Sequence, residues 1–245
     1  MKKIALLSSL CTLSLWADVY ATFESQAYRE ASLGMNASGI VKNVSVQNGD
    51  HVKKGSLLLQ LESTEEQLSL QMAKADLEAI SKETAFLSDQ YARYEKSAQV
   101  FDKNTLGKLK AELDAKRSQQ ERTRLSVAYS EQKLSKMRLT APFAGSISEK
   151  NIELGDMVSS MGGTPLFKLI SDQTKLLIQY DSKFGSQVKV GDRFCTSIDG
   201  KSTGKCTKII KIYPAINTKN RQLTAEADGS GLRPGTFGDG MITAK

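Results

Sequence analysis

Two short stretches of this sequence follow one pattern. Residues 39–52 read GIVKNVSVQNGDHV, and residues 145–158 read GSISEKNIELGDMV. Each has a glycine, nine residues, Gly-Asp, one residue and a valine, and the second copy begins 106 residues after the first. Alternating apolar residues around a Gly-Asp turn predict short antiparallel strands. Because neither copy can bury an apolar face alone, we expect two matched halves to pack face to face as one small β-sandwich with a pseudo-twofold axis.

The segment between the copies predicts a long helical hairpin. Residues 64–137 contain no proline and one glycine, Gly107. Apolar or small residues recur every third then fourth position from residue 70 to residue 101, which is a coiled-coil pattern. The ESTEE sequence at 62–66 is a helix start, with Ser63 or Thr64 as the cap. A break at 102–108 separates a second arm, so two antiparallel arms of about 35 residues should each reach roughly 50 Å.

The second arm is more polar than the first. Its apolar positions are interrupted near the middle by four polar residues: Lys116, Gln120, Thr123 and Ser130. Long polar side chains can lie along the seam of a hairpin that is largely solvated. Alternatively, these positions face other copies of the hairpin in an assembly. The sequence leaves both explanations open.

The first 17 residues, MKKIALLSSLCTLSLWA, have the layout of a secretory signal peptide. Cleavage is expected after Ala17 rather than Ala21, because VYATF at 19–23 has the pattern of a β-strand that the mature protein would keep. The pI is near 9.2, but export argues against nucleic acid as a partner. A basic exported surface is either simply solvated or attracts anionic lipid headgroups or an acidic protein face.

Two cysteines remain in the exported chain, Cys195 and Cys206. A two-residue loop at Gly200-Lys201 would place them directly opposite each other across a β-hairpin. An oxidising compartment permits a disulfide there. In that register, however, the pair falls at a hydrogen-bonded position, where a bridge is strained, so the sequence leaves this disulfide open.

The two Gly-Asp halves resemble the biotinyl/lipoyl carrier fold, whose cofactor lysine lies in the turn between the halves. Here the junction reads LQLESTEEQL, and Glu65 stands at the lysine position of that family's Glu-Ser/Thr-x-Lys motif. The resemblance therefore implies a lipoyl-like fold without a cofactor. A lipoyl fold split by a helical hairpin in an exported protein resembles the HlyD/AcrA-like periplasmic adaptors, or membrane fusion proteins, of tripartite efflux pumps. MRLTAPFAGSI at 137–147 is similar to that family's return strand.

The remaining sequence resembles the β-barrel domain of the same family. The matching pieces are VKVGDRF (188–194), GKCTKIIKIYPAINTKNRQLTAEA (204–227) and GLRPGTF (231–237). We therefore expect a multidomain α+β protein, mainly β, with an antiparallel α-helical hairpin inserted in a lipoyl-like β-sandwich and followed by a β-barrel domain. The expected divisions are a signal peptide at 1–17, an N-terminal strand joining the barrel at 18–38, a split lipoyl-like domain at 39–63 and 139–170, the hairpin at 64–138, and the barrel at 171–245. The resemblance is to a short-form member.

The resemblance implies a periplasmic adaptor associated with the inner membrane. It would bridge an inner-membrane transporter, expected to be of the RND type, and a TolC-like outer-membrane channel, exporting drugs or metal ions. The family also implies a homo-oligomer, expected to be a hexamer. The family's tip motif, Arg-x-x-x-Leu-x-x-x-x-x-x-Ser, matches at Arg93 and departs at Ser97 and Asn104. The channel contacts expected at the hairpin tip are Arg93, Ser97, Asn104 and Leu106. The alternative is an adaptor of a type I protein-secretion system.

No set of residues suggests catalysis or metal binding. His51, the single histidine, follows a Gly-Asp turn and has no Cys or carboxylate partners at metal-ligand spacing. No serine or cysteine nucleophile has another histidine available. Met157 and Met161 are soft-metal ligand types, but both lie in the second lipoyl-like half and are expected to pack there. The sequence therefore predicts a protein that is not an enzyme and holds no cofactor.

Overall fold

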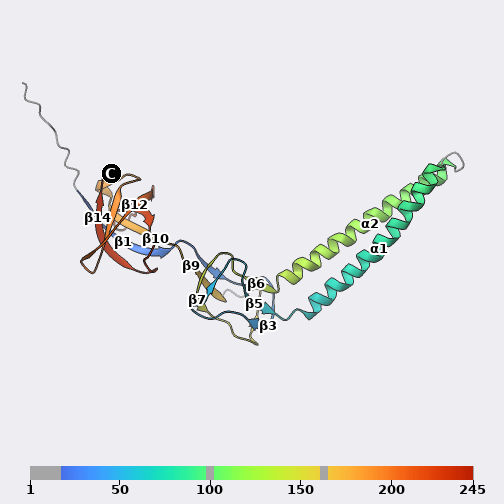
Figure 1. Cartoon of the computed structure of the whole chain (residues 1–245), viewed down its shortest axis with the longest axis horizontal. Coiled ribbons are helices and arrows are strands. Elements are labelled where there is room, and N and C mark those ends of the chain that lie inside the picture. The colour runs from blue at the N-terminus through green and yellow to red at the C-terminus, as the bar shows by residue number, and fades with distance from the viewer. Residues whose placement is uncertain (1–17, 98–101, 161–164, 245) are drawn as a thin grey trace, which may run out of the picture. The chain divides into compact units, whose positions relative to one another are not determined.

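A computed structural model describes residues 18–97, 102–160 and 165–244 (Figure 1). The predicted signal peptide, residues 1–17, lies outside these residues. The described residues divide into two compact units, one formed by residues 18–30 and 170–244 and the other by those between residues 31 and 169. Within the described ranges, no helix combines the length and the apolar character needed to cross a membrane.

The second unit contains a sandwich of two four-stranded sheets. One sheet has the order β2-β9-β7-β4 and the other has the order β6-β5-β3-β8. The strands are β2 (Glu30–Leu33), β3 (Gly39–Val44), β4 (His51–Val52), β5 (Leu57–Leu61), β6 (Arg138–Thr140), β7 (Gly145–Lys150), β8 (Met157–Val158) and β9 (Phe167–Ser171). Each sheet therefore takes two strands from each half of the chain.

The two copies of the repeat exchange strands. Gly39, which opens the first copy, pairs with Val158, which closes the second. Val52, which closes the first copy, pairs in turn with Gly145, which opens the second. The expectation that each half forms its own layer is therefore wrong. Alternation of apolar residues tells which face of a strand is buried, but it does not tell which strand lies beside it.

The Gly-Asp turns have equivalent roles in the two copies. Gly49 donates its N–H to the carbonyl of Ile147 (2.8 Å), and Gly155 donates its N–H to the carbonyl of Val41 (3.0 Å). Gly49 has φ +89° and Gly155 has φ +90°, a left-handed conformation that glycine adopts without steric cost. The aspartate after each glycine accepts a backbone N–H three residues earlier, in both copies at 2.8 Å. The repeated motif thus encodes one turn that is used twice to join the halves.

The sandwich core draws on both copies. Leu58, Leu59, Phe167 and Leu169 are fully buried, together with Ile147 and Val41. Burying a side chain of this size typically contributes about 1.5–3 kcal/mol. Since neither half holds this core alone, the two halves must fold together.

Two helices leave and return to this sandwich. Helix α1 spans Thr64–Lys96 and helix α2 spans Lys103–Ser135, and both have 33 residues. At about 1.5 Å per residue each is roughly 50 Å long. At the root, Leu61 before α1 donates its N–H to the carbonyl of Met137 after α2 (2.9 Å). Both ends of the hairpin are therefore joined by a backbone hydrogen bond.

The first unit is a closed six-stranded barrel with the order β1-β10-β13-β12-β11-β14. Its strands are β1 (Val19–Ala27), β10 (Thr174–Asp181), β11 (Arg193–Ile198), β12 (Lys201–Ile212), β13 (Gln222–Asp228) and β14 (Phe237–Thr243), and a short 3-10 helix spans Ser182–Phe184. The structure confirms the expected fold class: mainly β, with a helical hairpin inserted in a sandwich and a barrel after it. Residues 18–38, expected to form one strand of the barrel, instead contribute β1 to the barrel and β2 to the sandwich.

The centre of the barrel is filled by two aromatic rings. Phe23 and Phe194 meet edge to face, with ring centroids 5.7 Å apart. A Cβ at Gly238 would lie 2.9 Å from the Phe23 ring, and one at Gly240 would lie 2.8 Å from the Phe194 ring. A Cβ would lie closer still to β11 carbonyl oxygens, 2.3 Å from that of Ser197 and 2.2 Å from that of Cys195, so the two glycines of β14 make room for both the neighbouring strand and the rings.

Candidate functional site

The root of the hairpin is capped by Glu62. Ser63 is the N-cap residue of α1, but its hydroxyl accepts no capping hydrogen bond. Instead the Glu62 carboxylate accepts the backbone N–H groups of Ser63 (3.0 Å) and Thr64 (3.1 Å), and it also pairs with Lys42 (3.1 Å). The Thr64 hydroxyl, Lys42 and the backbone N–H groups together lower the pKa of Glu62 to about 2. The expected cap by Ser63 or Thr64 is therefore supplied by the residue before them.

The polar positions of the second arm pack within the hairpin. Lys116 forms an ion pair with Glu83 of α1 (2.8 Å). Gln120 donates from Nε2 to the hydroxyl of Ser81 on α1 (3.0 Å). Ser130 is buried. Of the two explanations that the sequence left open, these contacts favour polar residues that lie along the seam.

The far end of the seam is apolar. Leu87 of α1 packs with Leu109 and Leu113 of α2, and two partly buried tyrosines, Tyr91 and Tyr94, pack against them. Partial burial and a hydrogen bond to Glu95 (3.2 Å) raise the pKa of Tyr91. This cluster holds the two helices together next to the connection between them.

The four tip residues suggested by the sequence lie at the two helix ends. Arg93 is exposed in the last turn of α1, and Ser97 is the exposed C-cap. Asn104 is exposed in the first turn of α2, and Leu106 is partly buried in the next turn. The connection between the helices, residues 98–101, lies outside the described residues. The structure thus brings these residues to one end of the hairpin, and their contact with a channel stays a prediction.

The junction between the halves bears no lysine where a carrier would need one. Glu65 is exposed in the first turn of α1, so the position lies in a helix rather than in a hairpin turn. His51 lies in β4, where it pairs with Ser146 of β7. Among the described residues, no group of three or more His, Cys, Asp or Glu side chains could hold a metal ion.

Cys195 and Cys206 form a disulfide between β11 and β12. The turn is Asp199-Gly200, with φ of 51° and 72°, one residue earlier than expected. A bulge after Cys195 restores the opposition of the cysteines. Their Cα atoms are 4.0 Å apart, closer to the spacing of a non-hydrogen-bonded pair than to that of the hydrogen-bonded pair expected. The earlier turn explains the difference, because pair types alternate along a hairpin and Cys195 is three residues, not four, from the pair that closes the turn. The bulge inserts extra residues into β12 and so brings Cys206 back opposite Cys195.

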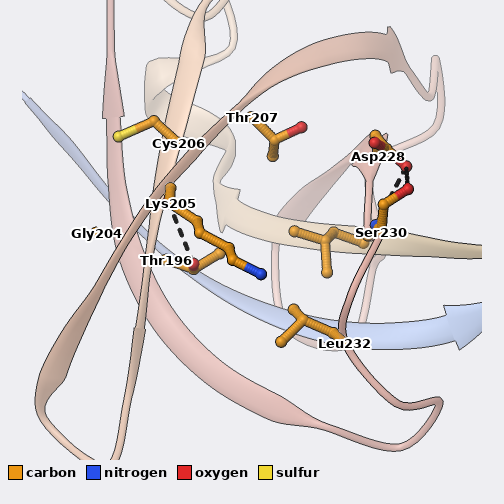
Figure 2. Close-up of a pocket in the computed structure, with 10 residues that line it drawn as sticks. Thr196, Gly204, Lys205, Cys206, Thr207, Asp228, Ser230 and Leu232 are labelled. Atoms are coloured by element: carbon orange, nitrogen blue, oxygen red, sulfur yellow. Dashed lines mark hydrogen bonds between the residues drawn. The ribbon is translucent and has the colours of Figure 1, made fainter.

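The same bulge borders a cavity of about 380 Å³ in the barrel unit. Figure 2 shows Lys205 reaching from β12 toward the loop that carries Ser230 and Leu232, with Asp228 and Thr207 also facing the cavity. Leu176, which belongs to the barrel core, also lines it. A volume of this size suits a small ligand. Sequence reasoning did not find this site, because its residues come from separate strands and no short motif joins them.

Comparison with known proteins identifies the family. The model of the CzcB-like, barrel-sandwich hybrid domain matches residues 29–169, which contain the sandwich and the hairpin. The cation efflux system protein CzcB of Alcaligenes sp. (strain CT14) is 27% identical over 215 residues, covering 82% of this chain and 40% of the relative. An uncharacterized protein of Haemophilus influenzae is 26% identical over 215 residues, covering 84% of this chain and 52% of the relative. The chain thus spans about half or less of the length of these relatives.

A solved structure shows the same fold. The membrane fusion protein Spr0693 from Streptococcus pneumoniae R6 superposes with a TM-score of 0.72 at 15% identity, covering 93% of this chain and 99% of that one. The family model covers more than half of the sequence and carries the interlocked sandwich with its inserted hairpin. The chain therefore belongs to the CzcB-like barrel-sandwich hybrid family.

Proposed function

We propose that this protein is the periplasmic adaptor subunit of a tripartite efflux system. It bridges an inner-membrane transporter of the RND type and a TolC-like outer-membrane channel, and the system exports drugs or metal ions. The observation that carries this proposal is the hairpin root, where Leu61 and Met137 are joined by a backbone hydrogen bond (2.9 Å). A helical arm of roughly 50 Å that is joined at both ends can hold two partners at a set separation.

The surface of the hairpin supports assembly into a homo-oligomer, which we propose to be a hexamer. Leu68, Met72 and Phe86 are more than half exposed on α1, and Leu125 and Tyr129 are more than half exposed on α2. Leu68 and Phe86 are 18 residues apart, which is five helical turns, so they lie on one line of α1. Exposed apolar side chains gathered on one face favour contact with another protein surface.

The proposal is tested by shortening the arm in cells. Deletion of the gene should raise sensitivity to divalent cations such as zinc, cobalt and cadmium, or to members of a drug panel. Complementation then compares the natural chain with a variant that lacks residues 82–119. Ser81 and Gln120 already contact each other at 3.0 Å, so a short glycine loop can join them. The pairs Lys74–Glu131 and Glu66–Lys133 nearer the root are kept.

We expect the shortened variant to be exported and folded but to leave cells as sensitive as the deletion strain. Full resistance with the shortened arm would contradict a bridging role. Photo-crosslinking gives a second test: a crosslinker at Ser97 or Asn104 should capture the outer-membrane channel, and one at the exposed Ser118, midway along α2, should not. Equal capture from both places would argue against contact through the tip.

A further inference from the structure

The barrel cavity presents two opposite charges that do not pair. Lys205 and Asp228 both line it, yet in the described part of the chain neither forms an ion pair with the other or with a third residue. Lysine and aspartate brought together on one small surface normally pair when their charged groups come within about 4 Å. The two charged groups therefore stay unpaired, and Figure 2 shows their side chains apart from each other.

Lys205 is held in place by its own backbone. Its N–H donates to the Thr203 hydroxyl (3.3 Å), and its carbonyl accepts from the Thr196 hydroxyl (3.3 Å). The next residue, Cys206, is tied to β11 by the disulfide. The amine lies against the opposite loop, since a Cβ built on Gly231 would be 3.0 Å from Lys205 Nζ. The bulge of β12 thus fixes the backbone of this lysine beside the cavity, while its side chain is exposed.

The opposite wall is equally well fixed. One carboxylate oxygen of Asp228 accepts from the N–H (3.2 Å) and the hydroxyl (2.7 Å) of Ser230. Gly229 is joined to Thr174 of β10 by its N–H (3.0 Å) and by its carbonyl, which accepts the Thr174 hydroxyl (2.6 Å). The loop cannot shift easily, because even a Cβ on Gly229 would meet the Lys175 backbone at 2.9 Å.

The remaining lining is mixed: it has two leucines, three hydroxyl side chains (Thr196, Thr207 and Ser230), Cys206 and two glycines. Leu176 is 1% exposed, and Leu232 packs against the same core. Thr207 faces the cavity, and its hydroxyl makes no hydrogen bond among the described residues. An exposed cation, an exposed anion, two leucines and a spare hydroxyl together make a complementary surface for one kind of molecule.

We propose that this cavity binds a small zwitterion, with an acid group at Lys205, an ammonium group at Asp228 and a short apolar body over Leu176 and Leu232. A free α-amino acid with an aliphatic side chain has this chemistry. Charge-assisted hydrogen bonds would orient both ends of the ligand. Because the backbone of both walls is already hydrogen-bonded, the conformational entropy lost on binding comes mainly from side chains such as that of Lys205.

The test separates the two charges of the ligand. L-leucine, isocaproate and isoamylamine share one branched skeleton, but isocaproate lacks the ammonium group and isoamylamine lacks the acid. Each is titrated into the ¹⁵N-labelled full-length protein, and amide shifts are followed by NMR. We expect leucine to give saturable shifts at residues 204–207 and 228–232. The two analogues should bind more weakly by about tenfold or more, since each loses one charge-assisted contact.

Variants then assign the contacts. Lys205→Met and Asp228→Asn should each weaken leucine binding by about tenfold or more, and Lys205→Arg should retain it. Lys208→Met is the matched control, because Lys208 is an exposed lysine of the same strand that does not line the cavity. Unchanged shifts at the barrel core, for instance at Phe23 and Ile178, verify that each variant is folded.

Three results would overturn the proposal. Absence of saturable shifts with leucine would show that the cavity is not a site for this ligand class. If isocaproate bound as tightly as leucine, Asp228 would not contact the ligand. If Lys208→Met weakened leucine binding as much as Lys205→Met, the effect would come from general surface charge. None of these outcomes bears on bridging by the hairpin, which the shortened arm tests separately.

Discussion

The sandwich and the hairpin lie in one stretch of chain but are stabilised in opposite ways. The sandwich buries a continuous apolar core to which both halves contribute, with Leu58, Leu59 and Phe167 fully inaccessible. The hairpin has an apolar cluster at its far end, around Leu113, and a seam that is partly polar near the middle. The sandwich therefore should open only as a whole, whereas the hairpin can open locally.

This difference suits the proposed work of an adaptor. A module that anchors a long helical arm needs a stable core. Strand exchange stabilises the sandwich, because neither half can unfold without breaking both sheets. An arm that meets other surfaces can instead carry weaker internal contacts. Four changes in sequence test how far this contrast extends, and they are ordered by the size of the expected effect.

The largest effect is expected from Leu59→Ala in the sandwich. Leu59 is 0% exposed, and a leucine-to-alanine change in a packed core costs about 2–5 kcal/mol. We expect protection against hydrogen exchange to fall at every sandwich amide. Leu113→Ala, 2% exposed in the hairpin, should cost a similar amount locally and leave the sandwich amides protected. Leu154→Ala, at a 69% exposed leucine, is the matched control. Loss of sandwich protection in Leu113→Ala would show that the two parts form a single cooperative unit.

The next effect concerns the symmetry of the two halves. Gly49→Ala and Gly155→Ala place a Cβ on backbones with φ near +90°, where no atom lies within 4 Å. The cost is therefore conformational, about 1–2 kcal/mol for each change. Denaturation of the sandwich should show two equal losses of stability. Gly34→Ala, also in open space but outside the left-handed region, should have little effect. Unequal losses would show that the two turns are not energetically equivalent in the folded sandwich.

A smaller effect is expected when a polar contact of the hairpin seam is made apolar, as in the sandwich core. The double variant Ser81→Ala with Gln120→Leu removes both partners of a polar contact between the helices. Replacing both partners by apolar groups is neutral to stabilising, so we expect a gain of about 0.5–1 kcal/mol in thermal unfolding followed by helical circular dichroism. Gln119→Leu, at the exposed neighbouring position, should give no gain. A double variant that loses stability would show that the hydrogen bond is required for the register of the helices.

Several of these features could be predicted from the sequence, and the reasons for the others are physical. The repeat predicted two matched halves, because both copies place Gly-Asp at the same position and a glycine there favours the same left-handed turn in each. It did not predict strand exchange, since register and partner depend on contacts far apart in the chain. The turn of the β11–β12 hairpin was misplaced by one residue because a regular hairpin with Cys195 opposite Cys206 has its loop at Gly200-Lys201. A bulge in β12, where Gly204 has φ +67°, lets the loop lie one residue earlier. The barrel cavity was not predicted for the same reason, as that bulge positions Lys205.

The smallest expected effect tests the joint between the two regions. The pKa of Glu62 is about 2 in the folded protein, below its ordinary value of 4.5, because the carboxylate caps α1 and pairs with Lys42. A carboxylate with a lowered pKa contributes stability that is fully present above pH 4.5 and is lost as the pH falls toward 2. Glu62→Gln should therefore flatten the pH dependence of unfolding in this window, followed by hydrogen exchange of the first turn of α1. Glu65→Gln, which removes another carboxylate of that turn, should leave the dependence in place. If Glu62→Gln keeps the full pH dependence, other groups must join the arm to the sandwich.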